Sequence, residues 1–512
     1  MASGMERRAQ MAFAPATGRT ETSNMRSKAR PNPASPLHRF AQQPGRGRPS
    51  PVGKTMSSVL EDNWKPISGP YRGYDQRGTP EPEWDLVKVG PGTKMGEYQR
   101  RFWQPVCFTS QLTDVPLLVR ILGEELVMFR DRSGRIGALH KHCCHRGTSL
   151  EYGRIEECGI RCCYHGWLFD VDGTVLDTPG EPGASRLKNA VFQGAYPTHE
   201  YHGLVHVYMG PPELKPAFPE FDVFKVPGLK FYPSAVTHRN NWLQSFENNM
   251  DPFHGQFLHT RISPHFGDHY LVLPTVEWKV TEDGRGIYYT AVRRVDDERL
   301  WVRLFHCIFP NYVFVASLYD LQPEEPYFQR TFYARRVVPI DDENCTFFSW
   351  RLAMDEGEFS GGDVTRNGWN SIDIDGQVEQ PTYELKQRVP GDWEAQTGQR
   401  PIALHKLERL GTTDAGIVRL RQALRKILAG QVPAALPPMG EGSLGSRDPE
   451  NVYSSNNVLR VRKLADPQAD GEQTRDVGRA VIGAVIEADA APAGTRRQLI
   501  IDKLRRIEAR YA

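Results

Sequence analysis

The sequence contains no uninterrupted apolar run of the about eighteen residues that a membrane-spanning helix requires. It also has no dominant charge, because 64 Lys and Arg face 62 Asp and Glu and leave a formal net charge of +2. Without an excess of positive charge, nothing indicates a nucleic acid or another polyanion as a partner. We therefore expect neither nucleic-acid binding nor a membrane location, and we expect the protein in the cytoplasm.

Cysteine is scarce and unevenly spread, with eight in 512 residues. A disulfide framework would need pairs distributed over the chain, as in small secreted proteins. Most of the cysteines instead gather in one short stretch, so the distribution indicates a metal site in a reducing compartment. The clustered residues are Cys143, Cys144, Cys158, Cys162 and Cys163, and the scattered ones are Cys107, Cys307 and Cys345.

Residues 1–55 are poor in acids and in apolar residues with a regular period. Only Glu6 and Glu21 are acidic, whereas Arg and Lys recur among Pro, Gly, Ser and Ala. Such a composition buries too little surface to become ordered. We expect a disordered basic extension over 1–75. An organelle-targeting peptide, a tail without function and a start placed too early, with Met56 as the true first residue, all stay open.

Two mixed pairs of Cys and His stand near the middle of the Cys-rich stretch. Cys143 and His145 form C-x-H, and Cys162 and His165 form C-x-x-H, each followed closely by a glycine. Two thiolates and two imidazoles satisfy a tetrahedral zinc ion. They also satisfy a Rieske [2Fe–2S] cluster, in which one iron takes both thiolates and the other both imidazoles. Mixed pairs suit two loops that each give one ligand to each iron, so the pattern favours the cluster over zinc.

The neighbours of these ligands have less direct roles. The spacing selects Cys143 and Cys162 as ligands, so we interpret Cys144 and Cys163 as small packing residues. Tyr164 and Trp167 are expected to shield the cluster and pack its loop. Short β-like runs and a D-G hairpin turn surround the pairs, which predicts a small all-β metal domain over 84–212. The runs are 117–122, 125–130 and 135–139, and the turn includes Asp172 and Gly173.

A second group of polar residues lies at 240–259. Glu247, Asp251 and His254 recur at i, i+4 and i+7, which predicts one helical face with two carboxylates and an imidazole. His259 would lie about 140° around that helix from His254, so both can reach one metal only if the helix ends or bulges, and Gly255 allows this. Two His and a carboxylate form the facial triad of non-haem Fe(II) oxygenases. The alternative is an ordinary amphipathic helix.

Together the two blocks resemble the oxygenase (alpha) component of Rieske non-haem iron oxygenases. The motif C-x-H … C-x-x-H-G-W is followed by E-N-x-x-D-x-x-H-x-x-x-x-H. The sequence segments 90–106 and 156–173 are most similar to the phthalate 4,5-dioxygenase-like branch, which includes O-demethylases of methoxyaromatics. The likeness runs from about 84 to about 430. It departs at Cys144 and Cys163, where family members usually have Pro.

The resemblance implies roles for individual residues. His254 and His259 match the imidazole ligands of a mononuclear iron, and Asn248 matches a polar residue near its open position. Asp251 matches a carboxylate that links His254 of one subunit to His165 of the next and carries electrons between them. This arrangement implies a trimer or a multiple of three.

The third iron ligand is implied less directly. In the family it comes just before a helix, and we expect that helix at about 403–429. Asp392 in G-D-W-E-A-Q is our choice, with Glu394 as the runner-up. More remote alternatives are Asp373, Asp375 and Glu379.

The resemblance also implies an α+β fold. We expect a catalytic domain over 213–430 of the helix-grip type, in which helices cover a curved antiparallel sheet. Residues 431–512 are expected to form a linker and a C-terminal helix (about 495–510). The expected strands are 272–280, 287–295, 301–309, 312–318, 329–338 and 345–354.

The expected activity is an oxygenase reaction that hydroxylates or O-demethylates a small, carboxylated aromatic substrate with dioxygen. A G-x-G-x-x-G fingerprint between a strand and a helix is missing, so a separate NAD(P)H-dependent reductase, directly or through a ferredoxin, would supply electrons. Two alternatives stay open, a Rieske-type electron carrier without oxygenase activity and a zinc-binding structural protein. Candidates to bind a substrate carboxylate are Arg261, Arg293, Arg294 and Arg303.

Overall fold

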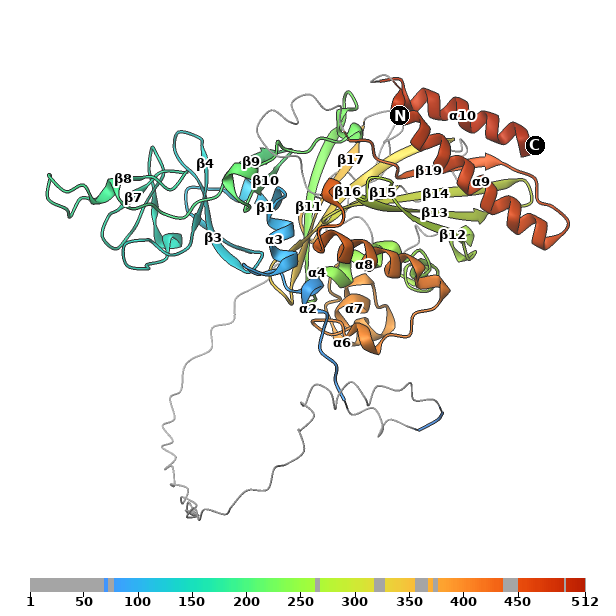
Figure 1. Cartoon of the computed structure of the whole chain (residues 1–512), viewed down its shortest axis with the longest axis horizontal. Helices are drawn as coiled ribbons and strands as arrows, with labels where there is room; N and C mark the ends of the chain where they lie inside the picture. The colour runs from blue at the N-terminus through green and yellow to red at the C-terminus, as the bar shows by residue number, and fades with distance from the viewer. Residues whose placement is uncertain are drawn as a thin grey trace, which may run out of the picture. The chain divides into compact units, whose positions relative to one another are not determined.

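The structure is a computed structural model, and the chain divides into two compact units, Met1–Gly78 and Thr79–Ala512. The expected extension over 1–75 lies outside the described residues, apart from 69–71. All features below belong to the second unit, which Figure 1 shows. The described residues are 69–71, 78–262, 268–316, 327–354, 367–371, 376–435, 450–491 and 494–511.

Small antiparallel sheets form the part of the second unit that carries the Cys-rich stretch. The three runs expected around 117–139 appear as the sheet β2-β3-β4. The expected D-G turn joins β7 to β8, where the Gly173 N–H donates to the Asp170 carbonyl at 3.0 Å. The elements are α2 Trp84–Val87, α3 Lys94–Arg100, β1 Gln104–Phe108, β2 Leu117–Ile121, β3 Glu124–Arg130, β4 Ile136–His140, β5 Arg154–Ile155, β6 Ile160–Arg161, β7 Leu168–Phe169, β8 Val175–Asp177, β9 Thr198–Tyr201 and β10 Leu204–Val207.

A nine-stranded sheet dominates the rest of the described chain. The six strands expected from the sequence are all present, as β12 to β17, and they pair antiparallel along the sheet. Nearly all residues of β13, β14, β15 and β17 are buried, as expected for short apolar runs that form strands covered on both faces. The strands are β11 Lys230–His238, β12 Thr275–Val280, β13 Gly286–Arg294, β14 Arg299–Ile308, β15 Tyr312–Ala316, β16 Gln329–Pro339, β17 Cys345–Ala353, β18 Gly368–Trp369 and β19 Ser455–Arg460.

The C-terminal segment adds β19 to this sheet, which the sequence analysis did not anticipate. Strand β14 pairs with β15 over its last residues, 306–308, and with β19 over 299–304. Helices α9 (Pro467–Glu487) and α10 (Arg496–Tyr511) follow and pack beside these strands (Figure 1). Their apolar side chains form a second core with Val302, Leu304 and Leu459. The segment is thus an integral part of the sheet and its covering layer.

Short helices cover another part of the sheet and carry the polar residues singled out above. The helix expected at about 403–429 begins only at Ala415. Two 3₁₀ turns precede it, and Asp414 accepts a hydrogen bond from the Gly411 N–H at 2.6 Å, which caps the chain at this point. The α-helices are α4 Trp242–Glu247, α5 His254–Phe257, α6 Tyr383–Arg388, α7 Asp392–Thr397 and α8 Ala415–Leu428.

Hydrogen bonds from one buried arginine tie the small sheets to the large one. Arg336 on β16 donates to the Trp103 carbonyl at 2.8 Å and to Oε1 of Gln104 at 2.8 Å. Its guanidinium also stacks over the ring of Tyr312 at 3.8 Å. A helix long and apolar enough to cross a membrane does not occur in the described part of the chain.

Candidate metal centres

Two loops of the same design carry the Cys and His pairs. In the first loop the Gly147 N–H donates to the Cys143 carbonyl at 2.8 Å, and in the second the Gly166 N–H donates to the Cys162 carbonyl at 3.2 Å. Both glycines have positive φ, +76° and +72°, which L-residues with a Cβ rarely adopt. The glycines that follow each pair therefore close the turns that present the ligands.

The two loops place their cysteine side chains in the interior and their histidine side chains near the surface. Cys143 and Cys162 are buried within one small apolar core, and their side chains interact with each other. The rings of His145 and His165 lie side by side near the surface, with centroids 4.6 Å apart. One pair of thiols and one pair of imidazoles is the donor set of a two-iron cluster. Burial raises the pKa of the Cys143 thiol to about 12, whereas a bound metal would favour the thiolate.

The residues next to the proposed ligands differ in how far they are buried. Trp167 is buried and stacks on His145 at 4.5 Å, as a residue that shields the cluster would. Tyr164 is exposed and contacts the His165 ring. The interpretation of Cys144 and Cys163 as packing residues is wrong, because both are exposed. They follow a buried cysteine in a tight turn, where the next side chain points outward.

The side chain of Gln193 holds the first loop in place through hydrogen bonds. The Cys144 N–H donates to Oε1 of Gln193 at 2.7 Å. Gln193 in turn donates from Nε2 to the carbonyls of His140 and His142 at 2.9 and 3.0 Å. Sequence reasoning missed Gln193, because nothing in the local pattern indicates a contact across about fifty residues.

The single helical face expected for the second group is wrong. Helix α4 ends at Glu247, a 3₁₀ turn covers Asn248–Met250, and Asp251 is extended with φ −108° and ψ 96°. Pro252 follows and has no N–H for a helical hydrogen bond. Glu247 instead points to Arg421 and pairs with it at 2.5 and 2.6 Å. The sequence signal for this break was Pro252 itself.

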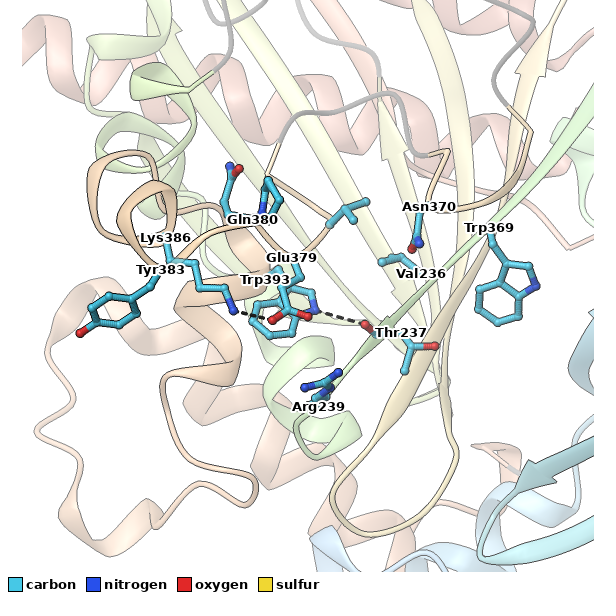
Figure 2. A pocket seen from close by; sticks show the side chains of 12 residues that line it. Val236, Thr237, Arg239, Trp369, Asn370, Glu379, Gln380, Tyr383, Lys386 and Trp393 are labelled. Atoms are coloured by element: carbon cyan, nitrogen blue, oxygen red, sulfur yellow. Dashed lines mark hydrogen bonds and ion pairs between the residues drawn. The ribbon is translucent and has the colours of Figure 1, made fainter. Parts of the chain in front are cut away.

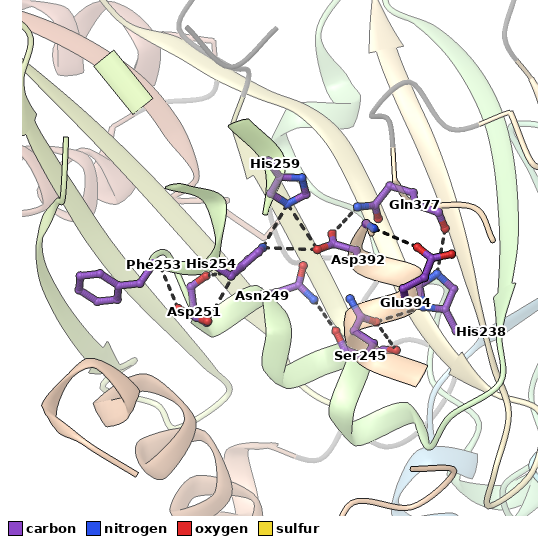
Figure 3. Close-up of polar contacts among 12 residues, drawn as sticks. His238, Ser245, Asn249, Asp251, Phe253, His254, His259, Gln377, Asp392 and Glu394 are labelled. Atoms are coloured by element: carbon purple, nitrogen blue, oxygen red, sulfur yellow. Dashed lines mark hydrogen bonds and ion pairs between the residues drawn. The ribbon is translucent and has the colours of Figure 1, made fainter. Parts of the chain in front are cut away.

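His254, His259 and Asp392 converge on one point (Figure 3). The Nε2 atoms of the two imidazoles are 3.1 Å apart, and Oδ1 of Asp392 lies 3.6 and 3.4 Å from them. Helix α5 gives way at Leu258 to the 3₁₀ turn His259–Arg261, so the break expected between the histidines comes three residues after Gly255. This turn brings both rings to the same side.

Asp251 orients the first imidazole. The Asp251 carbonyl oxygen is 2.5 Å from Nδ1 of His254, and its carboxylate Oδ2 is 3.7 Å away. Nδ1 therefore donates to the carbonyl, and the lone pair of Nε2 faces the convergence point. Burial opposes protonation of His254, but its hydrogen bond to Asp251 and the charges of Asp392 and Asp251 raise its pKa to about 9, so the Nε2 lone pair becomes available when a bound cation displaces the proton. For His259, burial lowers the pKa.

The carboxylate of Asp392 fits a bound cation. Its Oδ1 is buried without a hydrogen bond and faces the two Nε2 atoms, while Oδ2 accepts a hydrogen bond from Gln377. Burial acts to raise the pKa of Asp392, but the neighbouring His259 and His254 hold it below its usual value. Two imidazole nitrogens and one carboxylate oxygen on one side of a point are the donors of a non-haem Fe(II) site.

The alternatives to Asp392 have other contacts. Glu394 caps its own helix, accepting from the Gly391 N–H at 2.9 Å and the Gln380 N–H at 2.8 Å. Glu379 pairs with Lys386. Asp373 and Asp375 lie outside the described residues.

A cavity of about 80 Å³ opens beside the convergence point. Asn248 and Asp251 line it, as expected for residues near the reacting centre. Arg293 and Arg303 also line it, whereas Arg261 is exposed and Arg294 pairs with Asp470 at 2.5 Å. The other lining residues are Asn249, Pro252, His254, Gly255, His259, Tyr270, Tyr289, Ala291, Phe305, Val315, Arg335, Gln377 and Asp392.

Three arginines of the cavity are buried, with 2%, 9% and 7% of Arg293, Arg303 and Arg335 exposed. Arg293 donates to the Val272 carbonyl at 3.1 Å, and Arg303 donates to the Tyr270 hydroxyl at 2.5 Å. None of the three forms an ion pair with a carboxylate in the described parts of the chain. Burial lowers the pKa of Arg293 and Arg335, and at Arg335 the charge of Asp392 acts against this shift.

A larger, open hollow of about 720 Å³ lies on another side of α7 (Figure 2). Trp393 and Thr237 form part of its wall, and the Trp393 indole donates to the Thr237 carbonyl at 3.2 Å. Its lining includes none of the three converging residues. It is therefore separate from the candidate metal centre despite its size.

Comparison with known proteins matches both halves of this arrangement. A Rieske [2Fe-2S] domain model matches residues 102–192. The chain is 40% identical over 455 residues, 86% of its length and 96% of the relative, to the tert-butanol monooxygenase / tert-amyl alcohol desaturase oxygenase subunit of Aquincola tertiaricarbonis. It is 40% identical over 370 residues, 69% of its length and 85% of the relative, to the phenoxybenzoate dioxygenase subunit alpha of Ectopseudomonas oleovorans.

Solved structures show a weaker likeness. A mutant of NdmA from Pseudomonas putida CBB5 with theobromine matches with a TM-score of 0.49 and 19% identity, over 68% of this chain and 99% of that one. A likeness at this level supports no argument about activity.

Proposed function

Because this chain belongs to the Rieske non-haem iron oxygenases, as their oxygenase (alpha) component, we propose that it hydroxylates or O-demethylates an aromatic acid. Members of this family are oxidoreductases that use dioxygen and carry a [2Fe–2S] cluster and a mononuclear iron. The reaction class therefore follows from the family. The substrate class, the ligand residues and the assembly are our proposal.

The two candidate centres supply the residues for both groups. When bound, the cluster would store and pass single electrons, and the iron would activate dioxygen. The buried thiol pair, the adjacent imidazole pair and the unpaired Oδ1 of Asp392 support this assignment. The proposed cluster ligands are Cys143, His145, Cys162 and His165, and the proposed iron ligands are His254, His259 and Asp392.

The observation that carries the substrate class is the group of buried arginines beside the iron ligands. A buried guanidinium without an anionic partner is costly, because burial removes its hydration. Arg293 and Arg303 form no ion pair with any described residue, and Arg335 has the charge of Asp392 near it, so a bound ligand is the natural source of the negative charge that Arg293 and Arg303 lack. A carboxylate suits them best, since guanidinium and carboxylate can form two parallel hydrogen bonds.

The two relatives differ in this respect. One is named for phenoxybenzoate, a carboxylate, and the other for tert-butanol, a neutral alcohol. A neutral alcohol would leave the guanidinium groups of Arg293 and Arg303 without a counter-charge. The charge of the cavity thus favours an aromatic acid over a neutral alcohol, which remains the second candidate.

Two kinds of residue complete the proposed site. Asn248 and the aromatic wall of the cavity contact the substrate, and Asp251 orients the imidazole of His254. Asn248 offers an amide at the cavity, and Asp251 keeps the Nε2 lone pair of His254 directed inward. Tyr289 and Phe305 stack at 5.1 Å and form an apolar wall against which an aromatic ring can lie. Together these residues position a flat acid with its ring toward the iron ligands.

Electron transfer between the two centres is proposed to cross between subunits. His165 is partly exposed on the small β domain, and the Asp251 side chain is 30% exposed beside His254. In the described chain the two residues share no contact, and Figure 1 shows β7 and β8 well apart from α4. We propose that Asp251 contacts His165 of a neighbouring copy, which gives a ring of three or a multiple of three.

The electrons are proposed to come from a separate NAD(P)H-dependent reductase, directly or through a ferredoxin. We further propose that the protein works in the cytoplasm. All eight cysteines are free thiols, which agrees with a reducing compartment.

Product analysis under labelled dioxygen tests the substrate class. The protein with a generic reductase is given aromatic acids, methoxylated aromatic acids and small neutral alcohols, and label is traced to diol, phenol or alcohol, with formaldehyde as the sign of demethylation. We expect turnover of acids. Arg303→Met should raise KM for the acid by about tenfold to a hundredfold, the scale of a lost hydrogen bond to a charged group.

Arg294→Met is the matched control. Arg294 is the neighbour of Arg293 on β13, but it points away from the cavity to Asp470. The KM of the Arg294→Met variant for the acid should stay close to that of the wild type. Equal turnover of neutral alcohols and acids, with no effect of Arg303→Met on KM, would contradict the proposed substrate class.

A further inference from the structure

We propose that Gln377 is a positioning residue that leaves Asp392 one oxygen for the metal and connects that carboxylate to the cavity through Arg335. The first half concerns only the metal-binding residues. The second half rests on the proposed function, because it requires an anionic ligand beside Arg335.

Gln377 lies between the third iron ligand and the cavity arginine. Its side chain is buried, with 2% of the residue exposed. The amide Nε2 donates to Oδ2 of Asp392, and the amide Oε1 accepts from Nη1 of Arg335 at 3.3 Å. Figure 3 shows the Gln377 amide and the His254 ring on opposite sides of the Asp392 carboxylate.

The charges at both ends fix the orientation of this amide. A carboxylate accepts hydrogen bonds only, and a guanidinium donates only. A flipped amide would place oxygen against the Asp392 carboxylate and N–H against the Arg335 guanidinium, and both contacts would be repulsive. The bridge from Arg335 through Gln377 to Asp392 can therefore form in one direction only.

The backbone holds both ends of the bridge in place. The Trp393 N–H donates to the Gly376 carbonyl at 3.0 Å, which links the residues next to Asp392 and Gln377. Gly376 has φ +84°, and a Cβ there would lie 2.8 Å from the Cα of Gly391, so only glycine allows this approach. The Gln377 carbonyl also accepts from Nε2 of the buried His238 at 3.0 Å.

Two consequences follow for Asp392. Oδ2 is taken by the Gln377 amide, so Oδ1, which lacks a hydrogen bond, is the oxygen left to bind a metal. An anion that binds the other N–H groups of Arg335, of which Nε lacks a hydrogen-bond partner, shares the charge of the guanidinium that donates to Gln377 Oε1. Ligand binding in the cavity would then weaken the contact between Arg335 and Gln377 and change how firmly the amide holds Oδ2. Occupation of the cavity would in this way change the hydrogen bond that positions the carboxylate of Asp392.

The test replaces iron at the mononuclear site by Co²⁺ in the cluster-loaded protein. The oxidised Rieske cluster gives no electron paramagnetic resonance signal, so the spectrum reports the cobalt environment alone. The variants are Gln377→Met, which removes the amide, and Gln377→Glu, which keeps its shape but cannot donate to Oδ2. The matched control is Gln396→Met, because Gln396 is equally buried and binds His238 and Ser245 but not Asp392.

Both Gln377 variants should change the cobalt spectrum of the ligand-free protein. The cobalt dissociation constant should rise about tenfold to a hundredfold in Gln377→Met, as is usual when a group that orients a ligand is lost. Gln396→Met should match the wild type. Benzoate should shift the wild-type spectrum and leave that of Gln377→Met unchanged. Visible absorbance of the cluster confirms that each variant is folded.

The outcomes separate this inference from the proposed function. If equilibrium dialysis detects no benzoate binding to the wild type, the acid substrate class is wrong, and the ligand-free spectra still decide the role of Gln377. If both Gln377 variants keep the wild-type spectrum and cobalt affinity, the inference is overturned. If benzoate binds and shifts the spectra of the wild type and Gln377→Met alike, the connection to Arg335 is overturned.

Discussion

The peptide N–H of Cys144 donates a hydrogen bond to the side chain of Gln193, 2.7 Å away. Proline at position 144, which the resemblance implies as the usual residue, has no N–H and cannot make this bond. The departure from the family pattern is therefore accompanied by an added attachment of the first cluster loop. Gln193 is 1% exposed, so its amide oxygen would find no water in place of Cys144.

Replacing Cys144 by Pro should loosen the cluster. The variant leaves a buried amide oxygen without its donor, which costs about 1–3 kcal/mol. We expect the visible absorbance of the cluster to bleach at a lower temperature than in the wild type. Cys163→Pro is the control, because the Cys163 N–H makes no hydrogen bond within the described residues. Equal bleaching temperatures for the two variants would contradict the proposed role of Gln193.

Breaking the ion pair of Glu247 and Arg421 should destabilise the segment that carries Asp251. Both side chains are buried, with 7% and 6% exposed. Removing the only partner of a buried charge costs about 3–5 kcal/mol, but Arg421 also pairs with Glu408 at 2.5 Å. Glu247→Gln should therefore lower the free energy of unfolding in urea by less than this amount and reduce the iron content. Arg388→Met, at the exposed pair Arg388–Glu384, should change neither.

Acid should destabilise the fold through His306. Burial lowers the pKa of this ring to about 3, whereas an unfolded histidine titrates near 6.5. Between these values the unfolded chain binds a proton that the folded chain does not, so stability is full above about pH 6.5 and falls as the pH drops toward 3. The contribution is at most about 1.4 kcal/mol per pH unit.

Urea unfolding at several pH values measures this contribution. In His306→Phe the stacking on Tyr453, at 4.7 Å in the wild type, is retained and the titrating group is removed. The fall of stability below about pH 6.5 should be less steep in the variant. His238, whose pKa burial lowers to about 4, keeps part of the slope. An unchanged slope would show that the unfolded state does not protonate His306 in this range.

Mixed oligomers should reveal transfer between subunits. Cys143→Ser removes a proposed cluster ligand and His254→Ala removes a proposed iron ligand, so each variant alone should be inactive. Co-expressed with different tags and purified through both, the mixed oligomer should regain a measurable fraction of wild-type turnover. Transfer within one chain predicts no recovery. Adding Asp251→Asn to the Cys143→Ser subunit, which keeps the proposed iron ligands, should abolish the recovered activity.

The sequence predicted the strands of the large sheet well, because each is a local pattern. The six runs expected between 272 and 354 became β12 to β17. The strand β19 was missed, since its place is set by pairing with residues about 155 positions earlier. The same limit applies to the helix expected from about 403. Its apolar spacing continues through Leu404 and Leu407, but Gly411 and Asp414 delay the helix to Ala415.

The candidate sites divide in the same way. His254 and His259 were singled out by type and spacing and Asp392 by the family resemblance, and the structure brings the three together. Arg335 and Gln377 were missed, because their proximity to Asp392 depends on tertiary pairing of β16 with its neighbours. Glu247 was placed on the wrong face, because the i, i+4 rule assumes a continuous helix and Pro252 interrupts it. A residue that orients another side chain, such as Gln377, belongs to no motif that a single sequence shows.

The place of β19 has a consequence for biosynthesis. The half of β14 that it covers, 299–304, stays without its neighbour until residue 460 has emerged from the ribosome. The strands around the cluster, β1 to β10, have all been synthesised some 250 residues earlier. A message that ends near codon 450 would produce a polypeptide that contains every proposed metal ligand but has an open edge in the sheet that holds the oxygen-activating centre.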